Sequence, residues 1–240
     1  MALNVFNILR FLRASGARRA CPAVIADEPP TGPEGPQGAT NMTDQARRKA
    51  SVERRTRETD IRISLDLDGE GRASVRTGVG FMDHMLTLFA VHGLFDLEIA
   101  ATGDTEIDDH HTVEDLGICL GMAFARALGD KAGICRYGHA YVPMDETLAR
   151  VCADFSNRPH LHYDVTLAET RIGAFDTCLA KEFLRALVLH AGLTLHVDLL
   201  HGENGHHILE AVFKALARAL AAAAAPHPRV RGQLSSKGML

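Results

Sequence analysis

Several features that mark other protein classes are missing from this chain of 240 residues. It has no tryptophan and three tyrosines, and its five cysteines include no Cys-x-x-Cys pair. An odd number of widely spaced cysteines argues against a disulfide framework and favours a reducing compartment such as the cytoplasm. No run approaches the roughly 18 apolar residues that cross a bilayer, so we expect no membrane span. With 26 basic and 30 acidic residues the formal charge is −4, so we also expect no nucleic-acid partner.

What the chain does have is an ordinary globular composition with one excess. It is 46% hydrophobic and 23% charged, which suffices for a large core, and 13 of its residues are histidines. Residues 1–45 differ, with an apolar, arginine-bearing start and then the stretch PPTGPEGPQG, so we predict a disordered N-terminal extension. Such a start is typical of an organelle transit peptide. Met42 would equally serve as the first residue of a bacterial protein, which we favour, and only a transit peptide would change the expected cytoplasmic location.

The hydrophobic spacing of residues 46–240 predicts an α+β domain. Period-two alternation predicts strands over 61–67, 73–77, 96–102, 138–154, 161–165 and 193–199. Helical spacing predicts helices over 81–92, 112–128, 176–190 and 208–225, the last one ended by Pro226. The turn Asp68-Gly69-Glu70-Gly71 predicts that the first two strands form a hairpin.

An internal duplication is visible in the residues themselves. His110-His111-Thr112-Val113-Glu114 opens the first long helix, and His206-His207-Ile208-Leu209-Glu210 opens the last. Upstream, HMLTLFAVHGL from His84 aligns with EFLRALVLHAGL from Glu182. We therefore predict two repeats, about 46–135 and 136–225, followed by a C-terminal tail that contains SSKG.

The duplicated HHxxE motif favours metal binding. On a helix either histidine shares a face with the glutamate, whereas adjacent histidines point about 100° apart, so one motif cannot easily surround one ion. Two motifs related by pseudo-twofold symmetry would form two sites, one from His111, His206 and Glu210 and its mirror from His207, His110 and Glu114. His84 and Glu182 would complete them. Imidazoles and carboxylates without cysteine suit Mn, Fe(II), Co or Zn. A single such motif is more often a surface ion pair or a cap, and the doubling is what favours metal.

Further basic and hydroxyl residues suggest a phosphate pocket. Each has a plainer alternative, since Lys214 is spaced to pair with Glu210 on a helix and a tail serine or lysine is normally solvated. Taken together they supply anion donors from several parts of the chain. The set is Arg136, Arg158, Lys214, Ser235, Ser236 and Lys237.

With these motifs the chain resembles the imidazoleglycerol-phosphate dehydratase family of histidine biosynthesis. The resemblance runs from about residue 50 to residue 240. It rests on the segments Arg54-x-Thr56-x-Glu58-Thr59, TGVGFMDHML from Thr77, DDHHTVED from Asp108, TLH from Thr194, GHHILEAVFKA from Gly205 and SSKG from Ser235. It implies a domain over 46–240 built of duplicated α+β half-domains, each a small, mostly antiparallel sheet packed on helices, as in the ribosomal protein S5 domain 2-like fold.

The resemblance also implies two Mn²⁺ ions per active site and a closed homo-oligomer, a 24-mer, with active sites between subunits. One ion would be held by His84, His111, His206 and Glu210. The other would be held by His110, Glu114, His207 and the residue at position 182. At that position the family pattern has histidine before phenylalanine, whereas this chain has Glu182, so we expect an altered metal affinity.

The implied reaction is dehydration of D-erythro-imidazoleglycerol phosphate to imidazole acetol phosphate. Two metals would hold the substrate ring as an imidazolate whose electrons expel the adjacent hydroxyl. The candidate acid–base residues are Glu58, then Glu114 and Glu210. The substrate-binding residues implied are Glu58, His84, His92, His110, Glu114, Arg136, Arg158, His206, Lys214, Ser235, Ser236 and Lys237.

Two other functions compete with this interpretation. A dinuclear phosphoester hydrolase would use a metal-bound water and would act on generic phosphoesters. A metal-storage or assembly protein would explain HHxxE but would leave Glu58 and the basic residues without a purpose.

Overall fold

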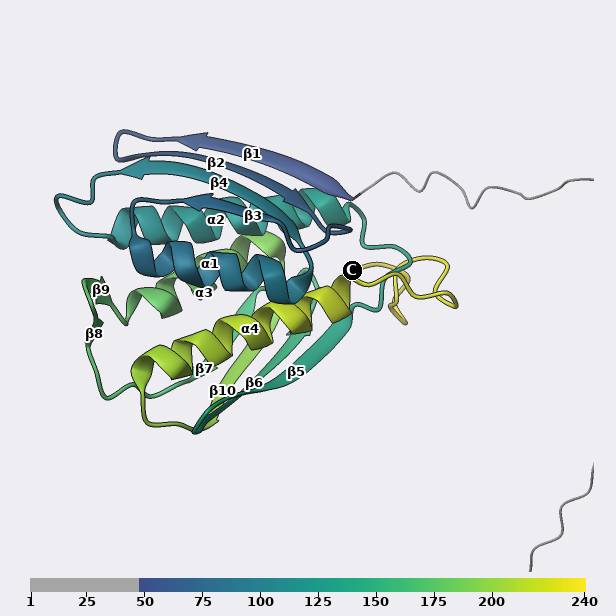
Figure 1. The fold of residues 1–240 in the computed structure, drawn as a ribbon. Helices are drawn as coiled ribbons and strands as arrows, with labels where there is room; N and C mark the ends of the chain where they lie inside the picture. Colours follow the sequence, from purple (N-terminus) through teal and green to yellow (C-terminus); the bar gives the residue numbers. More distant parts are fainter. Residues whose placement is uncertain (1–47) are drawn as a thin grey trace, which may run out of the picture. The chain divides into compact units, whose positions relative to one another are not determined.

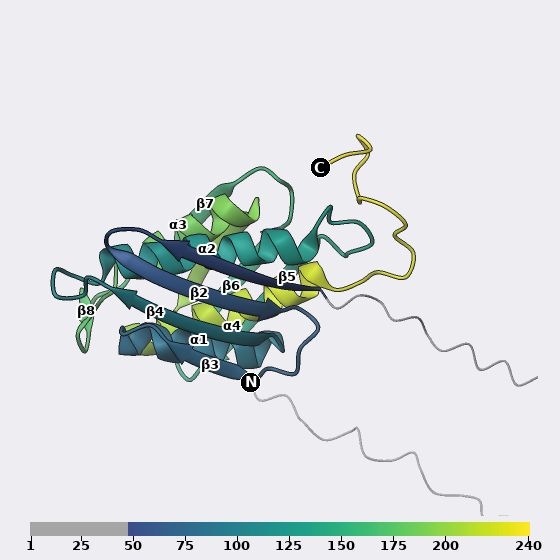
Figure 2. The ribbon, with the colours of Figure 1, turned by 90° about the horizontal axis from the view of Figure 1, so that it is seen from above.

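Four helices lie between two four-stranded sheets in residues 48–240, the part of the chain that this computed structural model describes (Figures 1 and 2). The first sheet has the order β1 (Lys49–Arg55), β2 (Thr59–Asp66), β4 (Asp96–Gly103), β3 (Ala73–Arg76). The second has the order β5 (Tyr137–Met144), β6 (Thr147–Asp154), β10 (Thr194–His201), β7 (His160–Asp164). The predictions for residues 1–45 lie outside the described residues.

The two sheets share one topology. In the first sheet β2 pairs antiparallel with β1 and β4, and β3 lies at the edge, parallel to β4. In the second sheet β6 pairs antiparallel with β5 and β10, and β7 lies at the edge, parallel to β10. The helices follow the same order, α1 (Gly80–Gly93) and α2 (His110–Leu128) in the first half, α3 (Leu179–Ala191) and α4 (Gly205–Ala224) in the second. The predicted class, α+β with duplicated half-domains, is confirmed. The second half adds a small ribbon of β8 (Arg171–Ile172) and β9 (Phe175–Asp176).

The helices cross between the halves. α1 of the first half packs on α4 of the second, and α3 of the second half packs on α2 of the first. The α2–α3 crossing is close because α2 carries glycine where the helices meet. A Cβ at Gly121 would lie 2.7 Å from the Leu187 carbonyl oxygen, and one at Gly117 would clash with the Phe183 carbonyl. Both of these helix-to-helix contacts therefore join one half to the other.

Buried phenylalanines from both halves continue this shared core. Phe89, Phe95 and Phe124 of the first half form a cluster, and the Phe124 ring lies 6.3 Å from that of Phe155 in the second half. Each of these four side chains is 1% exposed or less. A fully buried phenylalanine contributes about 1.5–3 kcal/mol, so the cluster joins the halves strongly.

Two predictions about the elements are wrong in detail. The strands predicted over 61–67 and 73–77 do not form a hairpin, because β2 pairs with β1 and β4 while β3 runs parallel to β4. The turn after β2 is instead fastened to the start of β4, where Asp96 accepts hydrogen bonds from the backbone N–H groups of Glu70 and Arg72. The helix predicted from residue 176 begins at Leu179, because Asp176 pairs with Arg171 in the β8–β9 ribbon.

Membrane insertion through a helix finds no support in this part of the chain. None of the helices in residues 48–240 combines the length and the apolar composition that crossing a bilayer requires.

Candidate functional site

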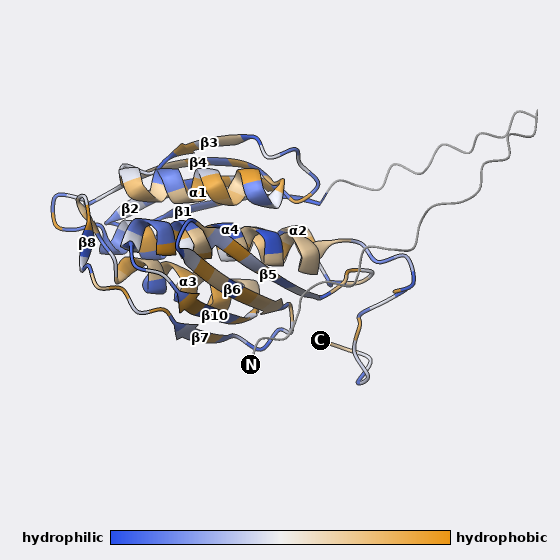
Figure 3. Cartoon of the chain, turned by 60° about the horizontal axis from the view of Figure 1, so that its bottom comes forward, coloured by the Kyte–Doolittle hydropathy of each residue, from blue (hydrophilic) through white to orange (hydrophobic). Residues whose placement is uncertain are grey.

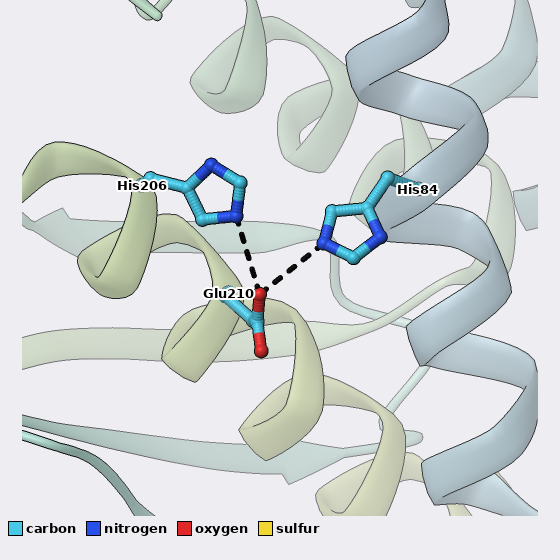
Figure 4. A group of neighbouring side chains, drawn as sticks. All are labelled: His84, His206 and Glu210. Atoms are coloured by element: carbon cyan, nitrogen blue, oxygen red, sulfur yellow. Dashed lines mark hydrogen bonds and ion pairs between the residues drawn. The ribbon is translucent and has the colours of Figure 1, made fainter.

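Three predicted metal ligands meet where α1 packs on α4 (Figure 4). His84 projects from α1, while His206 and Glu210 lie one turn apart on α4. The Glu210 Oε2 atom is 3.2 Å from His84 Nε2 and 3.3 Å from His206 Nε2. Ligands held at 2.0–2.2 Å from one ion lie roughly 3 Å apart, so these three side chains are close enough to share a metal.

The Glu210 carboxylate is buried in this group and is held by a neighbouring cation. Its residue is 7% exposed, and Lys214 Nζ donates a hydrogen bond of 2.6 Å to Oε1. Burial alone would raise the pKa of Glu210, but the hydrogen bonds from Lys214 and His84 outweigh it and lower that pKa. Oε1 is thus occupied by the lysine, and Oε2 faces both imidazoles.

His207, the neighbour of His206, faces a different carboxylate. Its Nδ1 atom lies 2.8 Å from Glu146 Oε2 in the turn between β5 and β6. The other Glu146 oxygen accepts the backbone N–H of Asn204 at 3.0 Å, and Asn204 caps α4 by accepting the N–H groups of His206 and His207. The hydrogen bond to Glu146 raises the pKa of His207. A histidine fixed at Nδ1 in this way presents Nε2 to a ligand.

The HHxxE motif on α2 is arranged in a related way. His111 Nδ1 lies 3.0 Å from Asp104 Oδ2 and 4.0 Å from Glu58 Oε2, and Glu58 is in the turn between β1 and β2. The hydrogen bond to Asp104 raises the pKa of His111. His110 Nε2 is 3.8 Å from Glu114 Oε2.

Glu182 lies on α3, the helix that packs on α2. Its carboxylate accepts a 2.6 Å hydrogen bond from Arg185 one turn later. Within residues 48–240, the structure places neither Glu182 with His110 and Glu114, nor His111 with the His84 group, at the spacing of a shared ion. It therefore assembles three of the four ligands predicted for one ion, and only the His110–Glu114 pair for the other.

The residues at the α1–α4 crossing fit a divalent transition ion. Two imidazoles and one carboxylate are a donor set of intermediate hardness that suits Mn, Fe(II), Co or Zn. The side chains of His84 and His206 are 45% and 41% exposed, which leaves one side of the group open to a further protein ligand and to a small molecule.

Comparison with known proteins decides the family. The family profile described as "Imidazoleglycerol-phosphate dehydratase" matches residues 77–220. A protein of that name from Aromatoleum aromaticum is 60% identical over 194 residues, covering 80% of this chain and all of its own length. One from Desulfotalea psychrophila is 56% identical over 193 residues, 80% of this chain and 96% of that protein. The chain belongs to the imidazoleglycerol-phosphate dehydratase family.

Solved structures of the imidazoleglycerol-phosphate dehydratase family agree. The Staphylococcus aureus enzyme has a TM-score of 0.68 at 44% identity and covers 75% of this chain and 99% of its own. The Pyrococcus furiosus enzyme, solved in complex with (S)-C348, has a TM-score of 0.69 at 38% identity and covers 79% and 100%. The chain is accordingly a hydro-lyase of histidine biosynthesis.

Within this member of the dehydratase family, most residues predicted to bind phosphate gather at the C-terminal tail. Arg136 is 6% exposed, and Asp154 accepts hydrogen bonds of 2.7 and 3.1 Å from its Nε and Nη2 atoms. Its Nη1 atom donates to the Leu234 carbonyl oxygen at 2.6 Å. Arg158 Nη2 lies 3.8 Å from the same Asp154. An open hollow of about 580 Å³ is lined by Arg136 and tail residues that include Ser235 and Ser236; Lys237, next in the tail, is exposed.

Lys214 lies elsewhere in the same chain. The backbone N–H of Arg136 is bonded to Ala223 near the end of α4. Ala223 is nine residues after Lys214, roughly 13 Å along the helix. Lys214 instead belongs with Glu210, to which it donates a hydrogen bond. His92 lies farther along α1, in a hollow that Arg218 also lines, and its pKa is lowered by burial and by the charges of Lys214 and Arg218.

Three carboxylates that sequence reasoning did not single out hold the predicted residues in place. Asp104 bonds His111, Glu146 bonds His207, and Asp154 bonds Arg136. Glu146 could have been predicted from the internal repeat. It lies in the turn between the first two strands of the second half, as the candidate residue Glu58 does in the first half. Asp104 and Asp154 lie at strand ends and have no such signal.

Proposed function

We propose that the chain dehydrates D-erythro-imidazoleglycerol phosphate to imidazole acetol phosphate at two Mn²⁺ sites. The observation that carries the proposal is the meeting of His84, His206 and Glu210 at the α1–α4 crossing, in a chain whose relatives bear the name imidazoleglycerol-phosphate dehydratase. An imidazole substrate offers two ring nitrogens, and two divalent sites would bind both.

The proposed active site lies between subunits of a homo-oligomer, a 24-mer. His111 lies beside Asp104 and His207 beside Glu146, at equivalent places in the two halves. Neither histidine lies with the other ligands predicted for its metal ion. A neighbouring copy would therefore supply His111 to His84, His206 and Glu210. By the same pseudo-twofold relation it would supply His207 to His110, Glu114 and Glu182. Each ion would then take its fourth ligand from the neighbouring chain, and Glu182 would turn from Arg185 to join His110 and Glu114.

When bound, the two ions would supply Lewis acidity and hold the imidazole ring in place. Dehydration removes the hydroxyl from the carbon next to the ring and a proton from the following carbon, which gives an enol that becomes the ketone. Glu58 is the proposed acid–base residue, because its exposed carboxylate lies 4.0 Å from His111 Nδ1. Such a group takes the carbon-bound proton and returns it to the ring-side carbon. Glu114 and Glu210 are the alternatives, and as ligands they are less free to exchange protons.

The other end of the substrate would be held by the basic residues. Asp154 fixes the Arg136 guanidinium and lies near that of Arg158, so both are oriented before the phosphate arrives. Ser236 and Lys237 of the tail would complete the grip, and Lys214, which lies beside Glu210 in this chain, would join it only from a neighbouring copy. Binding energy from the phosphate then fixes the reacting carbons against the acid–base residue.

The direct test is to incubate Mn-loaded protein with imidazoleglycerol phosphate and to measure the ketone product and inorganic phosphate together. Ketone without phosphate release supports the proposal. Phosphate release without ketone, from this compound and from generic phosphoesters, would replace the proposal with a phosphoester hydrolase. Bound metal with neither product would leave a storage protein.

The assembly is tested separately by native mass spectrometry of chelator-treated and Mn-reconstituted protein. Because each ion would join two chains, removal of metal should dissociate the large particle, and return of Mn²⁺ should restore it with two ions per chain. A particle of unchanged size after complete metal removal would contradict the shared sites.

A further inference from the structure

A second array of metal-binding side chains lies on the outer face of the second sheet. The edge strand β7 contains His162-Tyr163-Asp164, and its neighbour β10 contains His196-Val197-Asp198. The two strands are parallel, and their register pairs His162 with His196 and Asp164 with Asp198. Alternate residues of a strand share one face, and paired strands lie about 4.8 Å apart, so two His-x-Asp motifs form a square of four ligands.

The side chains of this square converge. Single ligand atoms of His162, Asp164 and Asp198 all lie within 4.8 Å of one another, and His162 Nε2 is 3.6 Å from Asp198 Oδ1. The ring centroid of His196 is 5.2 Å from that of His162. His162 and Asp198 have side chains that are 47% and 17% exposed, so the square opens to solvent on one side.

Arg150 holds one carboxylate of the square in place and leaves its second oxygen available to a ligand. Arg150 Nε on β6 donates a 3.1 Å hydrogen bond to Asp198 Oδ2. The Asp198 Oδ1 atom is the oxygen that faces His162. The arginine thus uses one carboxylate oxygen and turns the other toward the imidazole, the arrangement by which an outer partner positions a metal ligand.

This square is separate from the candidate active site. The residues that alternate with its ligands on β10, Leu195 and Val197, point inward and are fully buried. Helices α3 and α4 cover that inner face, while the square lies on the opposite face of the sheet, with β7 at its edge (Figures 1 and 3).

We propose that His162, Asp164 and Asp198, with His196 beside them, form an additional site for a divalent transition-metal ion such as Zn²⁺ or Co²⁺. One imidazole and two carboxylates at this spacing are donors that such ions accept, and the His196 imidazole beside them would supply a fourth. Within the sheet, β7 is joined only to β10, so a bound ion would fasten the edge strand through side chains as well as through the backbone ladder.

The test uses the full chain loaded with Mn²⁺ and kept in excess Mn²⁺, titrated with Co²⁺. Metal content and the visible absorption of Co²⁺ report binding. We expect one Co²⁺ per chain that is lost, or bound at least 10–100-fold more weakly, in His162→Gln and in Asp164→Asn. His201→Gln is the matched control, because His201 is an exposed histidine at the end of the same β10 strand, and it should retain the ion.

Both variant sites are exposed, so particle size and Mn²⁺ content should stay unchanged and will show that the variants fold. Equal Co²⁺ binding by wild type, His162→Gln and Asp164→Asn would overturn the site, and so would a wild-type chain that binds no Co²⁺ beyond the Mn²⁺-filled positions. Neither outcome depends on whether the protein dehydrates imidazoleglycerol phosphate.

Discussion

The α1–α4 and α2–α3 crossings are built from the same motif and differ in what surrounds it. At the first, Glu210 is buried, meets His84 on the facing helix and is held by Lys214 one turn later. At the second, the Glu114 side chain is 48% exposed and the residue one turn later is Ile118. The facing helix carries Glu182, which is paired with Arg185 of its own helix.

This difference shows that duplication of a motif does not duplicate its electrostatics. Both crossings carry HHxxE at the start of the second helix of a half, but a cation stands beside the carboxylate in only one of them. With glutamate in place of histidine on the facing helix, the α2–α3 group is also more negative. We expect the two proposed metal sites to differ in affinity for that reason, with harder ions favoured at the one to which two carboxylates would contribute.

The largest effect is expected from removing one carboxylate at a time. Glu210→Gln should abolish one metal site and Glu114→Gln the other, leaving one ion per chain in each case. Activity should fall by more than the roughly 10–100-fold that loss of an outer partner costs, because a direct ligand is lost. Metal content per chain and kcat/KM measure both, and two retained ions in either variant would refute its ligand role.

A smaller loss should follow when the partners of the second histidines are neutralised. Glu146→Gln removes the charge beside His207, and Asp104→Asn removes it beside His111. Each should lower metal affinity or activity by roughly 10–100-fold. Asp145→Asn is the control, since Asp145 is 73% exposed and 4.0 Å from His207. An effect of Asp145→Asn as large as that of Glu146→Gln would mean that surface charge, not the hydrogen bond, is responsible.

The helix ends offer a stability comparison that leaves the metal sites untouched. The left-handed residue that ends α1 is Leu94 at φ 57°, while glycine, Gly192 at φ 65°, occupies the equivalent place after α3. Because this region costs a non-glycine residue roughly 1–2 kcal/mol, Leu94→Gly should raise the free energy of unfolding by about 1 kcal/mol.

The reverse change should be the more harmful. Gly192→Leu should lower the free energy of unfolding by at least the same 1–2 kcal/mol, because a Cβ there would also lie 2.8 Å from Asn157 Oδ1. Urea unfolding at fixed protein and Mn²⁺ concentration measures both variants. Stabilisation by Gly192→Leu would contradict the assignment of strain to this conformation.

The smallest effect concerns acid stability, at a carboxylate that only the first half has. Hydrogen bonds from the Glu70 backbone, from the Arg72 guanidinium and from the Arg72 backbone hold the pKa of Asp96 well below its usual value. The equivalent place in the second half is Thr194, opposite Asp154 as Asp96 is opposite Asp66.

The sign of the effect follows from this lowered pKa. The stabilisation by Asp96 is fully present above its unfolded pKa of about 4 and is lost as pH falls below that value. Asp96→Asn should therefore destabilise the fold at pH 6 to 7, and the difference from wild type should shrink on acidification below about pH 4. Thr194→Val should show no such trend. Urea unfolding over a pH series decides, and a pH-independent difference for Asp96→Asn would rule out the charge as its cause.

The periodicity of hydrophobic residues predicted where helices and strands lie, but it did not predict which strands pair. The helical periods around HHxxE predicted α2 and α4, and the internal repeat predicted the duplicated fold. Alternation predicted β2 and β3 as strands, but it contains no information on pairing, so the parallel partnership of β3 with β4 was missed. The sequence 68–71 looks like a hairpin turn, but the backbone N–H groups of Glu70 and Arg72 donate to Asp96 at the start of β4. The chain therefore leads β3 to the edge of the sheet beside β4, and β3 does not pair with β2.

The site shows the same limit at longer range. His206 and Glu210 were predictable because one helical turn joins them. Glu146 and His207 are 61 residues apart, and their contact depends on a turn of one strand pair reaching the start of a helix. The phosphate-binding set was assembled by residue type, and helix length separates Lys214 from Arg136 within one chain.

The crossing of helices between the halves has an evolutionary consequence. His84 comes from one half and its partners from the other, so a half-length ancestor would have formed such a group only as a dimer of identical chains, with the same residue at the positions that are now 84 and 182. In one polypeptide that carries both copies, this identity constraint is absent. A substitution at one position does not appear at the other, so histidine at 84 and glutamate at 182 can coexist.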